Sequence, residues 1–329
     1  MKQADLGLNL TTKRTRKREF LAQMERVVPW AALVELVAPY APEGKKGRPP
    51  FAVETMLRVH FMQQWFTLSD PAMEESLHDV PLFREFAGLN WDSRIPDEST
   101  ILRFRHLLEK HKLAEQILVV INDLLSNKGL MLKAGTVVDA TLICAASSTK
   151  NKTGERDPEM KQSKKGNQWY FGMKAHIGVD AESGLVHTVR GTTGSVNDVV
   201  EANSLLHGEE TDAFGDAGYR GVAKRPDAAA DVNWHIAMQQ GTRKALDKTR
   251  HLGGLVEQVE KIKASIRAKV EHPFRVIKRQ FGHTKVRYRG LVKNTAQLKT
   301  LFALSNLWMA RKKLMALDGQ VRPLGMILA

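Results

Sequence analysis

The chain has 329 residues, 43% of them hydrophobic, and a formal net charge of +14. This length allows a sizeable core in two domains or one large one. The single cysteine, Cys144, excludes an intrachain disulfide and a cysteine zinc cluster. No run approaches the roughly 20 apolar residues of a membrane span, and the polar first 20 residues lack a signal core. We therefore expect a soluble, intracellular protein.

The positive charge is concentrated near the end of the chain. Between Gly241 and Ala329 there are 20 Lys and Arg residues but only 5 Asp and Glu residues, whereas the remainder is close to neutral. Such a one-sided basic field suits a polyanion, most simply nucleic acid. A basic surface that serves only solubility is the alternative.

The first part of the chain has a helical pattern. A basic segment at residues 13–18 precedes an amphipathic helix expected over residues 20–37. The Gly- and Pro-rich residues 42–50 indicate a linker. Apolar residues then recur at helical spacing from 51 to about 126.

Two helix starts stand out within this helical part. Ser69 precedes a first-turn proline, Pro71, and Asp97 begins an Asp-Glu-Ser-Thr sequence. The helix after Asp97 carries basic side chains that could face DNA, although a solvated helix face is at least as good an interpretation. These side chains are Arg103, Arg105, His106, Lys110 and Lys112.

After residue 128 the pattern changes to strands. They are expected over residues 135–143, 169–179, 185–192, 212–214 and 232–238, with a polar loop at 147–168. The turn-like residues 180–184 predict a hairpin between the second and third strands. Helices are expected over residues 198–206, 252–269, 274–281 and 294–314.

Asp139 lies in the middle of the first strand, among Val, Thr, Leu and Ile side chains. A buried carboxylate costs several kcal/mol unless a cation or hydrogen-bond donors compensate it, and the usual use of such a residue is to hold a metal ion. Asp216 lies just past the fourth strand. If the first and fourth strands are adjacent, the two carboxylates converge at one sheet edge. Oxygen-only ligands indicate Mg²⁺ or Mn²⁺.

A third carboxylate is needed to hold two metal ions, and Glu271 is the candidate. On one continuous helix it would share a face with Arg267, Arg275 and Lys278, which suits a metal ligand beside bound phosphates. An ordinary surface pair of Glu and Arg is the alternative, and spacing alone favours it. Pro273 either kinks this helix or begins a new one.

Five stretches together resemble the bacterial insertion-sequence DDE transposases of the insertion-sequence-five type. They are VVDAT at 137–141, KGNQW at 165–169, MKAHIGVD at 173–180, DAGY at 216–219 and EHPFR at 271–275. Each is weak alone, but the resemblance covers nearly the whole chain. The expected order of three strands, a helix, a strand, a helix, a strand and then helices is also that of a ribonuclease H-like fold. The expected class is therefore α/β: a ribonuclease H-like mixed sheet flanked by helices, preceded by an N-terminal helical domain.

The resemblance implies a divalent-metal triad of Asp139, Asp216 and Glu271 with two Mg²⁺ ions, Mn²⁺ being possible. It implies a DNA transposase that cleaves at the terminal inverted repeats of an insertion sequence. The freed 3′-OH ends are then joined to target DNA by two-metal phosphoryl transfer. It further implies a homo-oligomer, at least a dimer on DNA, with no membrane partner, in the bacterial cytoplasm and associated with the nucleoid.

The chain departs from the family pattern at two places. The family signature around the Glu contains Tyr, Arg, Glu and Lys; Arg267, Glu271 and Lys278 match it, but Ala264 stands at the Tyr position. A His-Asp pair common in the family is Asn197-Asp198 here, which leaves the role of Asp198 open. The rival functions are a metal-dependent nuclease that cleaves without joining and a DNA-binding protein without catalysis.

Three regions are expected: a basic arm and short helix at 1–47, a helical domain at 48–128 for binding DNA ends or oligomerisation, and a catalytic domain with basic C-terminal helices at 129–329. The expected DNA contacts are Arg267, Arg275, Lys278, Arg279, Lys285, Arg287, Arg289, Lys165 and Lys174. Trp169 is favoured as a core residue over a base-stacking one, and His176 and His187 as structural residues.

Overall fold

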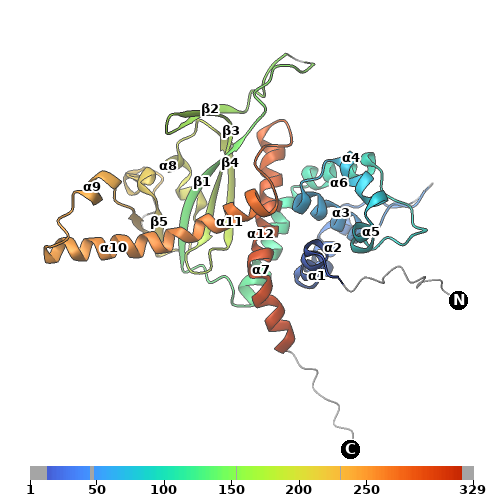
Figure 1. The fold of residues 1–329 in the computed structure, drawn as a ribbon, viewed down its shortest axis with the longest axis horizontal. Helices are drawn as coiled ribbons and strands as arrows, with labels where there is room; N and C mark the ends of the chain where they lie inside the picture. Colours follow the sequence, from blue (N-terminus) through green and yellow to red (C-terminus); the bar gives the residue numbers. More distant parts are fainter. Residues whose placement is uncertain (1–12, 45–47, 153, 230, 321–329) are drawn as a thin grey trace, which may run out of the picture.

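The computed structural model describes residues 13–44, 48–152, 154–229 and 231–320. A mixed sheet stands between two sets of helices, α1 to α6 on one side and α9 and α10 on the other, with α7 and α12 alongside it (Figure 1). The expected α/β class with an N-terminal helical region is confirmed. No helix within the described ranges is long and apolar enough to cross a bilayer.

The described residues of the N-terminal region form seven α-helices. They are α1 (Arg16–Val27), α2 (Trp30–Val37), α3 (Val53–Phe66), α4 (Asp70–Asp79), α5 (Pro81–Ala87), α6 (Glu98–Lys110) and α7 (Leu113–Asn127), with a 3-10 turn, η1, at Ala38–Tyr40. The single helix expected over residues 20–37 is wrong, because Val28 is extended and Pro29 separates α1 from α2. The two expected starts are confirmed: Ser69 caps α4 through Ala72 N–H, and Asp97 caps α6 through Thr100 N–H.

The sheet contains six strands. They are β1 (Gly135–Cys144), β2 (Lys161–Lys165), β3 (Gln168–Asp180), β4 (Val186–Thr193), β5 (Asp212–Gly215) and β6 (Asn233–Ile236). β1 pairs antiparallel with β3 and parallel with β5, β6 pairs parallel with β5, and β2 and β4 both pair antiparallel with β3. This mixed order is ribonuclease H-like, and the hairpin expected between the second and third predicted strands is β3–β4.

Two features of the sheet region differ from the sequence expectation. β2 lies inside the segment expected to be a polar loop, because its sequence, KQSKK, shows no apolar alternation. Between β5 and β6 the described residues form only two 3-10 turns, η3 (Ala217–Tyr219) and η4 (Val222–Lys224), and no α-helix. The helix after β4 is also shorter than expected: α8 (Asp198–Glu201) is followed by a 3-10 turn, η2, at Asn203–Leu205.

The C-terminal part is helical. Its elements are α9 (Gln240–Lys244), α10 (His251–Arg267), the 3-10 turn η5 (Ala268–Val270), α11 (Glu271–Arg275), the π-helical turn η6 (Val276–Gln280) and α12 (Leu291–Gln320). α12 packs on α7, β4 and α1. Buried Asn306 on α12 donates to Asn122 Oδ1 at 2.9 Å and to Val186 O at 2.7 Å, and accepts from Val186 N–H. One hydrophobic core therefore runs from the N-terminal helices to the sheet.

Candidate active site

Asp139 and Asp216 are brought to the same edge of the sheet by strand pairing. In the parallel pair of β1 and β5, Val137 lies opposite Phe214, and each Asp follows two residues later in its own segment. Side chains two residues apart on an extended chain share a face. The adjacency on which the convergence of these carboxylates depended is therefore confirmed.

The local backbone holds each of these two side chains. Asp139 Oδ1 accepts a bond from Ala140 N–H at 2.7 Å. Asp216 caps the 3-10 turn after β5, because its Oδ1 accepts from Gly218 N–H at 2.8 Å. A Cβ atom at Gly218 would lie 2.9 Å from that oxygen, so glycine leaves room for the capping carboxylate.

Glu271 begins a new helix. α10 ends at Arg267, the 3-10 turn η5 follows, and α11 starts at Glu271 with Pro273 in its first turn. Proline fits there because a first-turn N–H has no intrahelical partner. Of the two roles considered for Pro273, the structure shows the start of a new helix. Glu271 is exposed, and Arg267, which lies before the turn, is half-buried.

The three carboxylates form one electrostatic group. Burial raises the pKa of Asp139 to about 7, and the negative charges of Asp216 and Glu271 add to this increase, while Ala140 N–H and the Arg267 guanidinium oppose it. Carboxylates that act on one another in this way favour a bound cation, which would stabilise their charged forms. The structure thus brings Glu271 and Arg267 near Asp139.

Two of the side chains expected to contact DNA, Lys278 and Lys174, form hydrogen bonds within the protein. Lys278 Nζ donates to Thr141 Oγ1 at 2.6 Å and to Leu142 O at 3.0 Å, which ties η6 to β1 next to Asp139. Lys174 Nζ donates to Asp198 Oδ1 at 2.9 Å and to Val196 O at 2.7 Å. These partners give Asp198 a structural function that the sequence left open.

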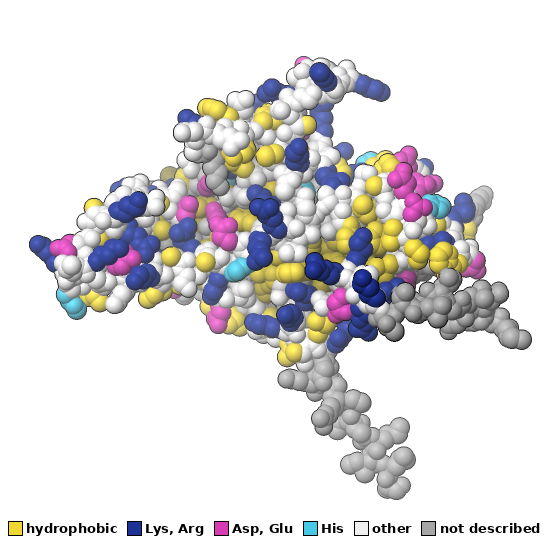
Figure 2. Space-filling view, in the orientation of Figure 1, with side chains coloured by type: hydrophobic (Ala, Val, Ile, Leu, Met, Phe, Trp, Pro, Cys, Tyr) yellow, Lys and Arg dark blue, Asp and Glu magenta, His cyan; other side chains and the backbone are white. Residues whose placement is uncertain are grey.

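The other expected contacts differ in their surroundings. Arg275, Arg279, Lys285, Arg287 and Arg289 are exposed, whereas the Lys165 side chain lies outside the described part of the structure. Arg287 also donates to Thr67 O. Lys and Arg side chains are spread over the face shown in Figure 2, with smaller acidic groups between them.

The burial of Arg105 and the exposure of Trp169 differ from what the sequence indicated. Arg105, considered as a DNA contact, is buried; it donates to Asp70 at 2.8 Å and Glu109 at 3.2 Å, and its guanidinium lies 4.3 Å from the Tyr288 ring centre. Trp169, favoured as a core residue, is 62% exposed beside Lys164, at the end where β2 and β3 pair.

Tyr219 is a site residue to which the sequence assigned no role. Its side chain is buried, and its hydroxyl has no hydrogen-bond partner among the described residues. Burial raises its pKa, and the charges of Asp139, Asp198 and Asp216 act in the same direction. The DAGY stretch that carries Asp216 thus also places a neutral phenol beside the acidic group.

A second group of ionisable side chains lies towards the other end of β1. Ligand atoms of His187, His207 and Glu210 lie within 4.8 Å of one another. Glu210 Oε1 accepts from Thr136 Oγ1 at 2.8 Å and from His207 N–H at 2.5 Å, and Oε2 accepts from Gly208 N–H at 2.7 Å. Thr136 Oγ1 also lies 3.0 Å from His187 Nε2. Both Glu210 oxygens are therefore used in a buried network, which supports a structural function for His187.

His176, fully buried and 2.8 Å from Thr192 Oγ1, is likewise structural.

Two family comparisons match this chain. Residues 131–307 match the family described as Transposase DDE domain, and residues 9–107 match the Transposase domain (DUF772). The first match covers more than half of the chain and contains all three carboxylates. The chain therefore belongs to the insertion-sequence DDE transposases, a family of divalent-metal-dependent DNA-cleaving enzymes, and is a DNA transposase.

Proposed function

We propose that this transposase, of the insertion-sequence-five type, cleaves DNA at the terminal inverted repeats of its element and joins the freed 3′-OH ends to target DNA. Asp139, Asp216 and Glu271 are the carboxylates of this reaction. The observation that carries the proposal is the convergence of Asp139 and Asp216 at adjacent parallel strands, with Glu271 close enough to raise the pKa of Asp139.

The residues of this group fit Mg²⁺ or Mn²⁺. Their donor atoms are carboxylate oxygens, the ligands these hard cations prefer. Asp139 is half-buried beside two other acids, so the local environment favours a positive charge. When bound, two such ions would activate the attacking oxygen and stabilise the leaving 3′ oxygen of a phosphodiester.

The protein's own residues supply positioning and charge neutralisation, which phosphoryl transfer chiefly requires. The β1–β5 pairing fixes Asp139 and Asp216, and Lys278 anchors the segment after Glu271 to β1. Exposed Arg275 and Arg279 lie just beyond Glu271. They contact DNA phosphates, which gives affinity without sequence information.

The regions divide the work. Residues 129–329 carry the chemistry, residues 48–128 bind the DNA ends or assemble the oligomer, and the basic residues at 13–18 add phosphate contacts. Two ends must be brought together, so the active species is at least a dimer on DNA. It acts on nucleoid DNA in the bacterial cytoplasm.

A gel assay with labelled terminal-repeat DNA, target DNA and Mg²⁺ tests this function. Wild type should give joined products, whereas Asp139→Asn, Asp216→Asn and Glu271→Gln should bind DNA without cleaving it. Glu182→Gln is the matched control, because Glu182 is an exposed acid in the β3–β4 turn. Cleaved but unjoined products would indicate a nuclease, and a mobility shift without cleavage would indicate a binding protein.

A further inference from the structure

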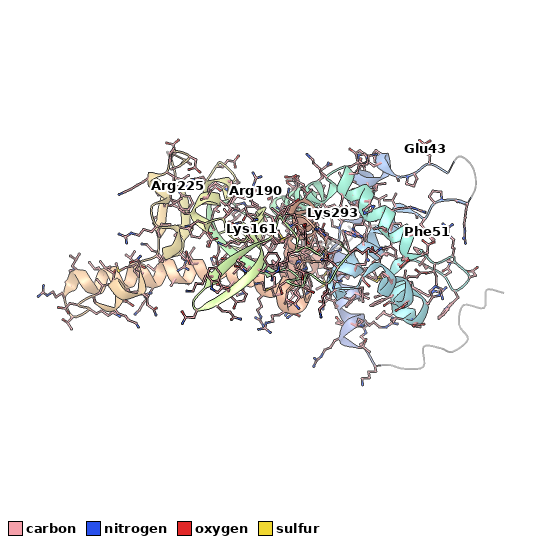
Figure 3. All side chains as sticks on the ribbon, turned by 90° about the horizontal axis from the view of Figure 1, so that it is seen from above. Glu43, Phe51, Lys161, Arg190, Arg225 and Lys293 are labelled. Atoms are coloured by element: carbon pink, nitrogen blue, oxygen red, sulfur yellow. The ribbon has the colours of Figure 1, made fainter. Side chains whose placement is uncertain are left out.

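Helix α10 (His251–Arg267) projects away from the sheet as an arm (Figure 1) and presents apolar side chains to solvent. Leu252 is 74% exposed, Leu255 45%, Val259 50% and Ile262 61%. These four residues form the apolar stripe. In the view from above, the arm reaches past the part of the chain that carries Arg225, at the opposite end of the molecule from Glu43 and Phe51 (Figure 3).

Two acidic residues away from the stripe, Glu257 and Glu260, are buried. Glu257 pairs with Arg243 at 2.9 Å and with Lys248 at 3.5 Å. Glu260 is only 4% exposed; it accepts from Met238 N–H at 2.9 Å and pairs with Lys263 at 2.9 Å. A surface helix normally turns its apolar stripe to the core and its charges to water. In α10 this arrangement is inverted, so the intramolecular contacts hold the helix in place while leaving the apolar stripe uncovered.

The stripe has the spacing of a seam between two helices. Its residues are separated by three, four and three positions, and Ile266, partly buried against the core, continues the pattern after four more. An average repeat of 3.5 residues keeps one apolar seam facing a partner helix. The pattern is close to symmetric about Val259: Leu252 and Ile266 each lie seven positions away, whereas Leu255 lies four positions before it and Ile262 three after. In a two-fold antiparallel pairing centred there, Val259 of one copy meets Val259 of the other, and Leu255 lies within one position of Ile262.

The charge of this surface suits a second copy of the same chain. The stripe contains no Lys or Arg, so it offers nothing to DNA phosphates. Lys263, which lies four positions after Val259 and therefore beside the stripe, is paired with Glu260 of its own helix at 2.9 Å. Two chains that each carry +14 can therefore approach along this helix with the lysine nearest the seam already partnered by an acid.

We propose that the apolar stripe of α10 pairs with the α10 stripe of a second transposase molecule when both are held on DNA ends. This inference rests on the proposed function, because two bound ends bring the copies together. A seam of four residues per copy falls below the roughly 800 Å² per partner of a standard stable interface. Pairing therefore depends on the high local concentration created by paired-end DNA.

Site-specific disulfide cross-linking tests the pairing. Cys144 is the only cysteine, so a Cys144→Ser background accepts single new cysteines cleanly. Val259→Cys lies at the centre of the seam, and Ala264→Cys is the matched control, exposed on the same helix but away from the stripe. On DNA with two terminal repeats, Val259→Cys should give at least 10-fold more cross-linked dimer than Ala264→Cys. Equal cross-linking of both, or none at Val259→Cys, would overturn the proposal.

The same experiment in an Asp139→Asn background separates this inference from the proposed function. Cross-linking measures pairing and does not require catalysis. If the protein that keeps Asp139 formed cross-linked dimers but did not cleave DNA, the α10 interface would be supported and the proposed function would be contradicted. In the parent background, Leu255→Glu with Ile262→Glu should reduce concerted joining of two ends at least 10-fold while single-end cleavage persists. Lys261→Glu, an exposed change off the stripe, should retain concerted joining. Concerted joining at the wild-type rate by the double variant would contradict the pairing.

Discussion

Asp139 and Asp216 occupy matching positions of neighbouring parallel segments, each two residues beyond the paired residues Val137 and Phe214. Their approach is therefore set by main-chain pairing, and backbone N–H groups of Ala140 and Gly218 fix one oxygen of each carboxylate. Groups held by a rigid sheet need little reordering when a ligand binds. Burial of Asp139 beside two other acids destabilises its charged form and raises its pKa.

The first prediction concerns stability against pH. The pKa of Asp139 is about 7 in the folded protein and close to 3.9 in an unfolded chain. Between these values the folded state keeps a proton that the unfolded state has lost, so stability falls as pH rises from about 4 to 7. The loss amounts to roughly 4 kcal/mol at about 1.4 kcal/mol per unit. Urea unfolding in a chelator at pH 5 and pH 8 covers about 2 of these 3 units, so Asp139→Asn should gain roughly 3 kcal/mol over wild type between the two pH values.

Comparison with Asp139→Asn is essential to that measurement, because other groups titrate in the same range. Burial lowers the pKa of His60 and His283 to about 4, so these residues stabilise the fold as pH rises through their unfolded values. They contribute equally to both proteins. An identical pH dependence in wild type and Asp139→Asn would show that Asp139 is not in the environment described.

The second prediction concerns Mg²⁺. A cation bound only by the folded state stabilises it by about 2.7 kcal/mol at a concentration of 100 times Kd. For a chain of this size, that corresponds to a rise in Tm of roughly 4 °C. Thermal unfolding at pH 8 should show this rise in wild type and lose it in Asp139→Asn with Asp216→Asn. NaCl at equal ionic strength is the control, and an equal rise with NaCl would mean that only surface charge is being screened.

The sequence predicted the two aspartates because each stands in a strong local pattern, Asp139 within an apolar strand and Asp216 before a glycine turn. Glu271 required the family resemblance, since its neighbours alone favour a surface pair. The sequence could not reveal the partners of Lys278 and Lys174 within the protein, because Thr141 lies 137 residues from Lys278 and Asp198 lies 24 residues from Lys174. β2 has no apolar alternation and forms only by pairing with β3, which no local pattern reveals.

The third prediction concerns Lys278 and Arg279, which the sequence analysis both expected to contact DNA. Lys278 donates two hydrogen bonds to β1, so Lys278→Met should lower the free energy of unfolding by about 1 to 3 kcal/mol because two half-buried acceptors lose their partner. Exposed Arg279 should change stability by less than about 0.5 kcal/mol when replaced by Met. Its loss should instead reduce the slope of log affinity against log salt by about 1. Urea unfolding and DNA titrations across salt concentrations measure the two effects. The reverse result would exchange the functions assigned to these side chains.

The fourth prediction concerns Trp169 as a platform for an unpaired base. Its ring is 62% exposed, with Lys164 Nζ 6.0 Å from the ring centre, so an apolar face and a cation stand together where β2 and β3 project (Figure 1). Stacking of one base contributes about 1 to 3 kcal/mol. Trp169→Ala should therefore weaken binding of end DNA with an unpaired terminal base by about 5- to 150-fold, and fully paired DNA much less. Trp91→Ala is the matched control, because Trp91 is 69% exposed with Arg84 4.9 Å from its ring centre but lies in the N-terminal helical region. Fluorescence titrations measure the DNA affinity of both variants. An equal loss of affinity in Trp169→Ala and Trp91→Ala, or an equal loss on paired and unpaired ends, would show that Trp169 contributes to non-specific DNA binding and not to base stacking.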